Sequence, residues 1–225
     1  MLDKQLIPSF TKLETPFFYY DLELLQKTLD AAKQYGSSKG FHIHFALKAN
    51  NNPRILKMIQ EAGFGADCVS GNEVQLAIDN GFAPENIAFA GVGKTDGEIR
   101  IGLQHDIYCF NCESRQEIEV INELAGQANK TARIALRLNP NVDARTHKYI
   151  TTGLDENKFG INEAELSSVL ELLENCAHIE LIGIHFHIGS QIIEMEPFRK
   201  LAKRAGELAD EIETRGFKLS HVNVG

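Results

Sequence analysis

Lys48 is the first residue along the sequence whose type and expected position, at the end of a strand, indicate a chemical role. Residues 45–50, Phe-Ala-Leu-Lys-Ala-Asn, are an apolar run with a lysine near its end, and residues 51–53, Asn-Asn-Pro, stop any strand. Side chains alternate between faces along a strand, so His44, Ala46 and Lys48 are predicted to share one face. Lys48 is then expected at the C-terminal end of its strand, the edge at which barrel enzymes carry their active sites. Most strand-end lysines simply extend into solvent, so the rest of the sequence has to decide.

A second candidate group lies at the end of a later apolar run, residues 183–191, Gly-Ile-His-Phe-His-Ile-Gly-Ser-Gln. Alternation places His187 at the C-terminal end, on the same edge as Lys48. Gly189 and Ser190 follow it directly. Because glycine lets an anion approach the backbone closely, these two residues can offer backbone N–H groups and a hydroxyl to a phosphate. His185, deeper in the strand, is expected to be a hydrogen-bonded core residue.

Two charged residues interrupt apolar strands. Asp67 lies among small and apolar residues, and Arg137 lies near the end of another apolar run. A buried carboxylate is uncommon unless it is paired, so Asp67 is expected to have a cationic or hydrogen-bonding partner. Asp67 and Arg137 could satisfy each other or a neighbour. The long polar segment 139–161 follows Arg137, and a long loop after a strand is often functional, but its residues indicate no specific role.

The sequence also contains weaker signals for a metal. His42 and His44 form an H-x-H pair, which can hold a divalent metal in barrel hydrolases, but they open their strand and so lie away from the active edge. Cys109 and Cys112 have C-x-x-C spacing, yet no second pair of matching spacing follows them. We therefore predict no metal site, and we expect the four cysteines to be buried, reduced thiols in a cytoplasmic protein.

Alternating strands and helices are needed to position these groups. Strands are predicted at 43–48, 66–69, 87–91, 107–110, 132–138, 179–187 and 219–224, and helices at 53–62, 71–80, 95–104, 114–127, 162–175 and 195–215. This alternation is typical of βα units with a parallel sheet. Ser70 with Glu73 and Ser114 with Glu117 are predicted capping boxes. Before this repeat, an aromatic strand is expected at 15–20, followed by a helix at 22–36 that Asp21 caps.

Seven strands follow the first helix, whereas a closed (β/α)8 TIM barrel needs eight. The sequence therefore predicts an α/β barrel that is truncated after about seven strands, although an open doubly wound sheet would also tolerate seven. The expected organisation is a lead-in segment with the first helix over 1–40 and an incomplete barrel over 41–225.

Composition narrows the range of partners. Hydrophobic residues make up 43% of the chain and charged residues 24%, values that are typical of globular proteins. The net charge of -8 argues against nucleic acid or an anionic membrane as the main partner. No run approaches the roughly 18 apolar residues of a membrane span, and the N-terminus lacks the pattern of a signal peptide.

The motifs occur in an order and at a spacing that carry a resemblance over nearly the whole chain. They are residues 15–21, 45–50, 67–73, 137–140, 147–153, 158–160 and 185–191. Together they resemble the diaminopimelate decarboxylase family of pyridoxal-phosphate enzymes, which have an alanine racemase-like barrel. The resemblance implies a carboxy-lyase of lysine biosynthesis that converts meso-2,6-diaminopimelate to L-lysine and CO2, with pyridoxal 5'-phosphate as its cofactor.

The resemblance also implies roles for individual residues. Lys48 corresponds to the lysine that forms the Schiff base with the cofactor, and His187 to the residue that stacks on the pyridine ring. The resemblance also implies that Ser190 is a phosphate ligand, with Gly189 beside it. Gly225 corresponds to the first glycine of a phosphate loop, and Asp67 to an acidic residue near Lys48. A partly desolvated site lowers the pKa of a lysine, and this would let it attack an aldehyde as a neutral amine.

Members of this family continue beyond the position of Gly225 with a glutamate, an arginine segment and a C-terminal β domain. We therefore expect the chain to be the N-terminal barrel portion, inactive alone, of a homodimer that acts on a small amino acid. Two alternatives stay open. One is a decarboxylase of arginine, ornithine or carboxynorspermidine on the same fold, and the other is a non-catalytic homologue that binds pyridoxal phosphate.

Overall fold

The computed structural model describes residues 4–140, 159–190 and 192–225 of the 225. Most of the segment 139–161, including the motif at 147–153 and Lys158, lies outside the described residues, as does Gln191. The chain divides into two compact units, Met1–Phe41 and His42–Gly225.

The N-terminal unit contains a 3-10 helix η1 (Lys4–Leu6), a short helix α1 (Ile7–Phe10) and a longer helix α2 (Leu22–Ser37). Asp21 caps α2 as predicted, because its carboxylate accepts a hydrogen bond of 2.9 Å from the backbone N–H of Leu24. The helix ends one residue later than the sequence predicted.

The predicted aromatic strand at 15–20 is wrong, because these residues form neither strand nor helix. The rings of Phe17 and Tyr19 instead pack against Phe10, with centroid distances of 5.5 Å and 5.1 Å. Aromatic residues favour a strand when a neighbouring strand supplies cross-strand contacts, and the contacts here come from a helical residue.

The second unit is built on one sheet of seven parallel strands, which follow one another in chain order. They are β1 (His44–Ala46), β2 (Gly65–Cys68), β3 (Ile87–Phe89), β4 (Cys109–Cys112), β5 (Ala132–Arg137), β6 (Ile179–His185) and β7 (His221–Asn223). A doubly wound sheet reverses its strand order at a switch point, whereas a barrel keeps it. The observed order is that of the predicted barrel.

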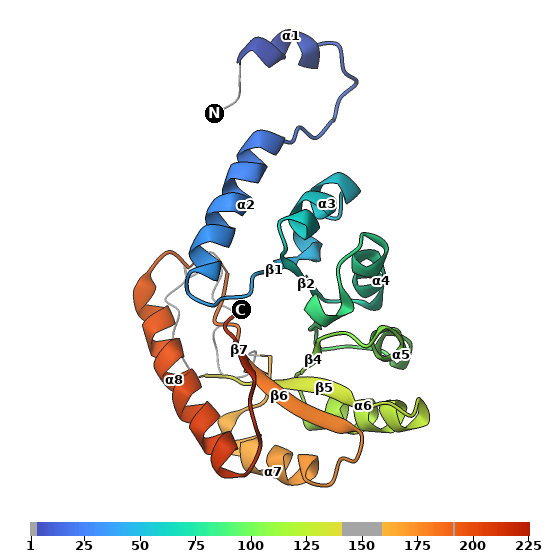
Figure 1. Ribbon diagram of the computed structural model, residues 1–225, viewed down its shortest axis with the longest axis vertical. Coiled ribbons are helices and arrows are strands. Elements are labelled where there is room, and N and C mark those ends of the chain that lie inside the picture. Colours follow the sequence, from blue (N-terminus) through green and yellow to red (C-terminus); the bar gives the residue numbers. More distant parts are fainter. Residues whose placement is uncertain (1–3, 141–158, 191) are drawn as a thin grey trace. The chain divides into compact units, whose positions relative to one another are not determined.

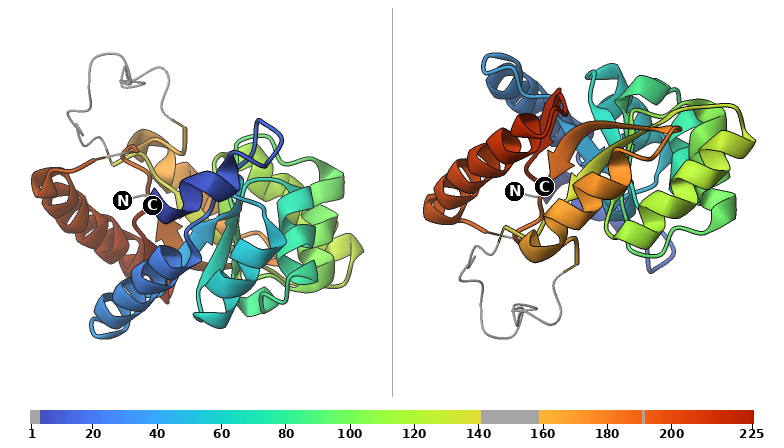
Figure 2. Two further views of the ribbon diagram at one scale, coloured as in Figure 1. Left: turned by 90° about the horizontal axis from the view of Figure 1, so that it is seen from above. Right: turned by 90° about the horizontal axis from the view of Figure 1, so that it is seen from below.

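Helices connect the strands and lie on the outer side of the sheet. They are α3 (Pro53–Glu61), α4 (Gly71–Asp79), α5 (Asp96–His105), α6 (Arg115–Gln127), α7 (Glu163–Leu173) and α8 (Met195–Thr214), with short 3-10 helices η2 (Leu47–Ala49) and η3 (Pro84–Asn86). Figures 1 and 2 show α3 to α7 following one another around the outside of the curved sheet. Among the described helices, none is both long enough and apolar enough to cross a bilayer.

The two sides of the sheet carry different residues. Phe89 and Phe110 pack together on the helix side, with ring centroids 6.0 Å apart, and a Cβ at Gly102 of α5 would meet the Phe110 ring. On the inner side, four strands contribute a layer of smaller buried side chains: Ala88, Cys109, Ala135 and Ile182. The large rings of Phe89 and Phe110 therefore pack between the helices and the sheet, whereas the layer on the inner side consists of smaller side chains.

The predicted capping boxes are half correct. The hydroxyl groups of Ser70 and Ser114 accept hydrogen bonds from the backbone N–H groups of Glu73 and Glu117, at 3.3 Å and 3.2 Å. The two carboxylates do not return to the serine N–H groups, but bind the N–H of the residue before each serine, at 2.7 Å and 2.8 Å. Each glutamate thereby fixes the C-terminal end of the strand before its helix.

Candidate active site

Lys48 lies just beyond its strand rather than in it. The sequence predicted a strand to residue 48, but β1 ends at Ala46 and Lys48 belongs to η2. The turn comes early because the side chain of Asn50 accepts a hydrogen bond of 2.9 Å from the N–H of Asn52, whose own side chain caps α3. Alternation along the strand was therefore the wrong reason for the orientation of Lys48. Its buried neighbour Leu47 anchors the turn, and the Lys48 side chain is exposed.

Asp67 is on β2, where it is the register partner of Ala46. Burial raises the pKa of the Asp67 carboxyl to about 6. The positive charges of Lys48 and Arg137 oppose this rise, whereas the carboxylate of Glu73 adds to it. Lys48 and Asp67 therefore interact electrostatically, and the strong effect of burial explains why the carboxyl is protonated more readily than an exposed one.

His187 follows β6 by two residues and remains accessible to solvent. Its pKa lies below the ordinary value because of partial burial and because of the positive charges of Arg137 and Lys48; the carboxylate of Glu113 acts in the opposite direction. Lys48 therefore acts electrostatically on both Asp67 and His187. Groups from the ends of β1, β2 and β6 meet at one edge of the sheet.

Gly225 approaches the same imidazole. A Cβ on Gly225 would lie 3.0 Å from the Phe186 carbonyl oxygen and 3.3 Å from Nδ1 of His187, and the glycine has a φ of +94°. Both the space and the backbone conformation disfavour any other residue. The N–H of Gly225 donates to the side-chain oxygen of Asn223 at 2.9 Å. The backbone of Gly225, which no side chain covers, is thereby held beside His187.

Gly189 and Ser190 continue the chain from His187. Both are exposed, and Gly189 has a φ of +137°, which favours glycine. The structure thus brings Lys48, Asp67, His187 and Gly225 to one edge, which we call the rim. Gly189 and Ser190 extend from it along the chain.

Sequence reasoning missed Glu113, which is the partner of Arg137. Nη1 of Arg137 donates to both carboxylate oxygens of Glu113, at 2.8 Å and 2.7 Å. The exposed fractions of the two side chains are only 12% for Arg137 and 4% for Glu113. Arg137 therefore pairs with a neighbour and not with Asp67. The signal was in the sequence, because Glu113 directly follows β4 and Arg137 is the last residue of β5, so the two charges stand at neighbouring strand ends.

Sequence reasoning also missed Lys94, whose side chain is 1% exposed. Its Nζ donates to the carbonyl oxygens of Gly91 and Asn111, both at 2.8 Å, and to Oε1 of Glu117 at 2.5 Å. The ammonium also lies 5.4 Å from the centroid of the Phe89 ring. All its donors are used, so Lys94 is a structural link from the loop after β3 to β4 and α6.

His185 is buried, as predicted for a core residue, but its Nδ1 has no hydrogen-bond partner within the described chain. Burial, followed by the positive charge of Arg137, lowers the pKa of His185 to about 3. Its surroundings therefore favour the neutral imidazole.

The cysteines and the H-x-H pair form no metal site in the part of the chain that the structure describes, since no three His, Cys, Asp or Glu side chains there are placed to hold an ion. All four thiols are free, and three are buried. Cys109 and Cys112 are three residues apart in β4 and so point to opposite faces. His44 lies at the start of β1, as expected, with its ring 6.5 Å from that of Tyr108.

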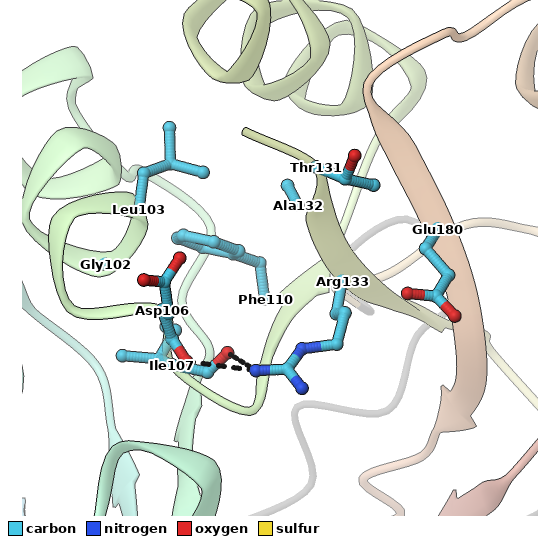
Figure 3. A pocket seen from close by; sticks show the side chains of 9 residues that line it. All are labelled: Gly102, Leu103, Asp106, Ile107, Phe110, Thr131, Ala132, Arg133 and Glu180. Carbon is cyan, nitrogen blue, oxygen red and sulfur yellow. Dashed lines mark hydrogen bonds between the residues drawn. The ribbon is translucent and has the colours of Figure 1, made fainter. Parts of the chain in front are cut away.

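A small cavity of about 130 Å³ lies at the other ends of the strands (Figure 3). It is lined by residues that precede or begin β4, β5 and β6, among them Ile107, Ala132 and Glu180. Arg133 closes one side by donating to the carbonyl oxygens of Asp106 and Ile107, at 3.0 Å and 2.9 Å. The cavity is separate from the rim, because parallel strands carry their beginnings and their ends on opposite edges.

The geometry defines a class of protein: a parallel βα barrel with a lysine, a carboxyl, an imidazole and glycine backbone at the C-terminal edge. The pyridoxal-binding domain of the pyridoxal-dependent decarboxylases matches residues 22–225. The chain belongs to this family. The family and the cofactor that the sequence predicted are both confirmed by this match.

Diaminopimelate decarboxylase of Bacteroides thetaiotaomicron is 49% identical over 97% of this chain and 57% of its own length. A structure of a variant of diaminopimelate decarboxylase from Helicobacter pylori, in complex with L-lysine, has a TM-score of 0.88 and 37% identity, over 96% of this chain and 55% of that one. The arginine decarboxylase of Paramecium bursaria Chlorella virus has a TM-score of 0.76 and 26% identity, over 89% and 52%. The chain thus spans about half the length of its relatives, and the barrel fold is confirmed.

Proposed function

We propose that this chain is the pyridoxal-phosphate-binding barrel of a diaminopimelate decarboxylase, over residues 41–225, which releases CO2 from meso-2,6-diaminopimelate to give L-lysine. The observation that carries this proposal is the 49% identity to a diaminopimelate decarboxylase over nearly the whole chain. The rim supports it independently, because it offers the amine, imidazole and bare backbone that an anionic aromatic aldehyde needs.

The residues at the rim fit this cofactor. The hydrogen in place of a side chain at Gly225 leaves backbone uncovered beside His187, where a Cβ would approach Nδ1 to 3.3 Å. We assign Gly225, Gly189 and Ser190 to the phosphate, since glycine N–H groups and a hydroxyl are good phosphate donors. His187 would stack on the pyridine ring and fix its plane.

When bound, pyridoxal phosphate supplies an electron sink for the electrons that remain as CO2 leaves. The residues of the protein position the cofactor and the substrate, and they move protons. Lys48 would hold the cofactor through Nζ, and its ammonium would have to give up a proton to do so. Asp67 is the neighbouring carboxyl, and burial raises its pKa to about 6, which is closer to neutral pH than that of an exposed carboxyl.

The substrate is proposed from the relatives. The H. pylori structure was solved with L-lysine, which is the product of the proposed reaction, and its identity to this chain is higher than that of the viral arginine decarboxylase. The two alternatives predict a different response to added amino acids. They are decarboxylation of arginine, ornithine or carboxynorspermidine, and cofactor binding without catalysis.

Two further properties stay predictions. We propose a homodimer for the complete protein, as the resemblance implies. We propose the cytoplasm as its location, and the four unpaired thiols support this, because disulfides are rare in reducing compartments.

The test is to add pyridoxal phosphate to the purified chain and follow its absorbance, with borohydride reduction and mass spectrometry to locate the modified residue. The wild-type chain should be modified at Lys48, and Lys48→Ala should lose the absorbance of the lysine-bound cofactor. Lys57→Ala is a matched control, because Lys57 makes only an exposed contact with Glu61. An unchanged spectrum in Lys48→Ala would sink the assignment.

The substrate is tested on the complete protein loaded with pyridoxal phosphate, because the chain alone is expected to be inactive. meso-2,6-Diaminopimelate should change the absorbance of the lysine-bound cofactor at lower concentrations than arginine or ornithine do, because the preferred amino acid would compete best with Lys48 for the cofactor. A stronger response to arginine or ornithine would favour the alternative decarboxylases. No response to any amino acid would favour the non-catalytic homologue.

A further inference from the structure

The Glu113–Arg137 ion pair is almost completely buried, yet it lies at the rim beside the exposed His187. Burying two charges costs free energy that their attraction offsets only when the geometry is good and other hydrogen bonds help. A pair of this kind at the edge of a site therefore calls for an explanation other than fold stability.

We propose that Glu113 is a positioning residue, whose carboxylate fixes the guanidinium of Arg137 at the rim beside His187. This inference rests on the proposed function only in treating His187 as the residue that contacts the cofactor. The placement of Arg137 itself follows from the contacts of the described residues.

The Glu113 carboxylate is held from two directions. Its Oε1 accepts a hydrogen bond of 3.1 Å from the backbone N–H of Gly91 as well as one from Arg137. The backbone N–H of Glu113 donates to Oε2 of Glu117 at 2.8 Å, and Oε1 of Glu117 binds the buried Lys94. The loops after β3 and β4 thus hold the carboxylate in place through contacts that do not involve the guanidinium.

Arg137 is confined on its other sides. Its register partner on β6 is His185, two residues before His187. The guanidinium carbon lies 5.6 Å from the centroid of the Phe159 ring, and a Cβ on Gly160 would come within 3.3 Å of Cγ of Arg137. Packing therefore confines the stem, and Glu113 sets where the charged end lies.

The position of the guanidinium matters for the charge on His187. The charged and titratable groups that face His187 are Lys48 from η2, Glu113 from the end of β4, Arg137 from the end of β5, and His185 from β6. Arg137 lowers the pKa of His187 more than the other charges do, and the Glu113 carboxylate raises it. Partial burial lowers the pKa of the His187 imidazole most, and Arg137 at the rim adds to this effect, so both favour the neutral form.

The test follows the titration of His187 by NMR of its imidazole in the cofactor-free chain, with His187→Asn used to identify its signal. In Arg137→Met the midpoint should rise, because the cation is gone. In Glu113→Gln the midpoint should also rise, because Arg137 leaves the rim and its effect on His187 is larger than that of the lost carboxylate. If the guanidinium stayed in place without Glu113, loss of the carboxylate would lower the midpoint instead.

A fall or no change of the midpoint in Glu113→Gln overturns the proposal, and so does an unchanged midpoint in Arg137→Met. Glu113→Asp keeps the negative charge but shortens the side chain by one methylene, so it should give a smaller rise of the midpoint. It is the milder variant to use if Glu113→Gln does not fold. Glu119→Gln removes an exposed carboxylate paired with Arg115 on α6 and should change nothing. Because no cofactor is present, the outcome is independent of the Lys48 experiment, and the two proposals can fail separately.

Discussion

Asp67 is a carboxyl group on which its surroundings act in opposite directions. Burial raises its pKa from 3.8 to about 6, while Lys48 and Arg137 lower it. The folded chain therefore binds this proton more tightly than the unfolded chain does. Between about pH 4 and pH 6 the folded state must release a proton that the unfolded state has already lost, and its stability falls as the pH rises through this range.

We predict that Asp67→Asn removes this loss. From pH 4 to pH 7, the free energy of unfolding of the wild-type chain should fall relative to that of the variant by on the order of 3 kcal/mol, since each pKa unit corresponds to about 1.4 kcal/mol. Urea unfolding of both cofactor-free chains at the two pH values measures this difference. A stability difference between the two proteins that is the same at both pH values would contradict the prediction.

At the scale of single residues, the sequence indicated which residues interrupt apolar strands but not how they pair. Asp67 and Arg137 were expected to need partners, and the structure shows that Arg137 pairs with Glu113. That choice depends on which strand ends are adjacent and on their register, and a single sequence does not contain this information. Glu113 was overlooked because it stands just before a helix cap, where a carboxylate is unremarkable.

At the scale of elements, the alternating pattern predicted the seven strands and six α-helices described in the second unit, with errors of a few residues at the ends, but neither 3-10 helix. The ends were missed where side-chain hydrogen bonds decide them. Asn50 and Asn52 turn the chain after Ala46 and move Lys48 from β1 into η2. Such a bond competes with strand pairing locally, and hydrophobic periodicity does not detect it.

Two glycines in this unit have opposite packing, and this leads to a matched pair of predictions. A Cβ on Gly183 of β6 would lie 2.5 Å from the carbonyl oxygen of His221 on the neighbouring strand. Backbone cannot move aside cheaply, so Gly183→Ala should destabilise the chain by about 2 kcal/mol or more. Gly206 in α8 has open space around its Cβ position. Gly206→Ala should stabilise the chain by roughly 0.5–1 kcal/mol, because alanine favours a helix.

Urea unfolding of the two alanine variants beside the wild-type chain measures both effects. Equal changes in stability for the two variants would show that the close approach of β6 and β7 at Gly183 does not limit the fold. A stabilised Gly183→Ala would contradict the strand register that places His221 opposite Gly183.

For the whole molecule, the thiols report how the chain unfolds. Cys68 on β2 and both Cys109 and Cys112 on β4 are buried in the same sheet, whereas Cys176 is partly exposed. Burial raises the pKa of all four thiols, to about 12 for Cys109. The thiolate is the reactive form, so both access and ionisation protect the buried three.

We predict that one thiol of the native chain reacts readily with a disulfide reagent and that the other three react only as the chain unfolds. Cys176→Ser should remove the fast phase and leave the slow one. Because β2 and β4 lie within one sheet, the three slow thiols should react together, at the urea concentration at which the circular dichroism of the helices is lost. Rapid reaction of Cys68 or Cys112 in the native chain, the cysteines at the C-terminal ends of β2 and β4, would mean that the sheet opens locally at the rim, where the cofactor is proposed to bind.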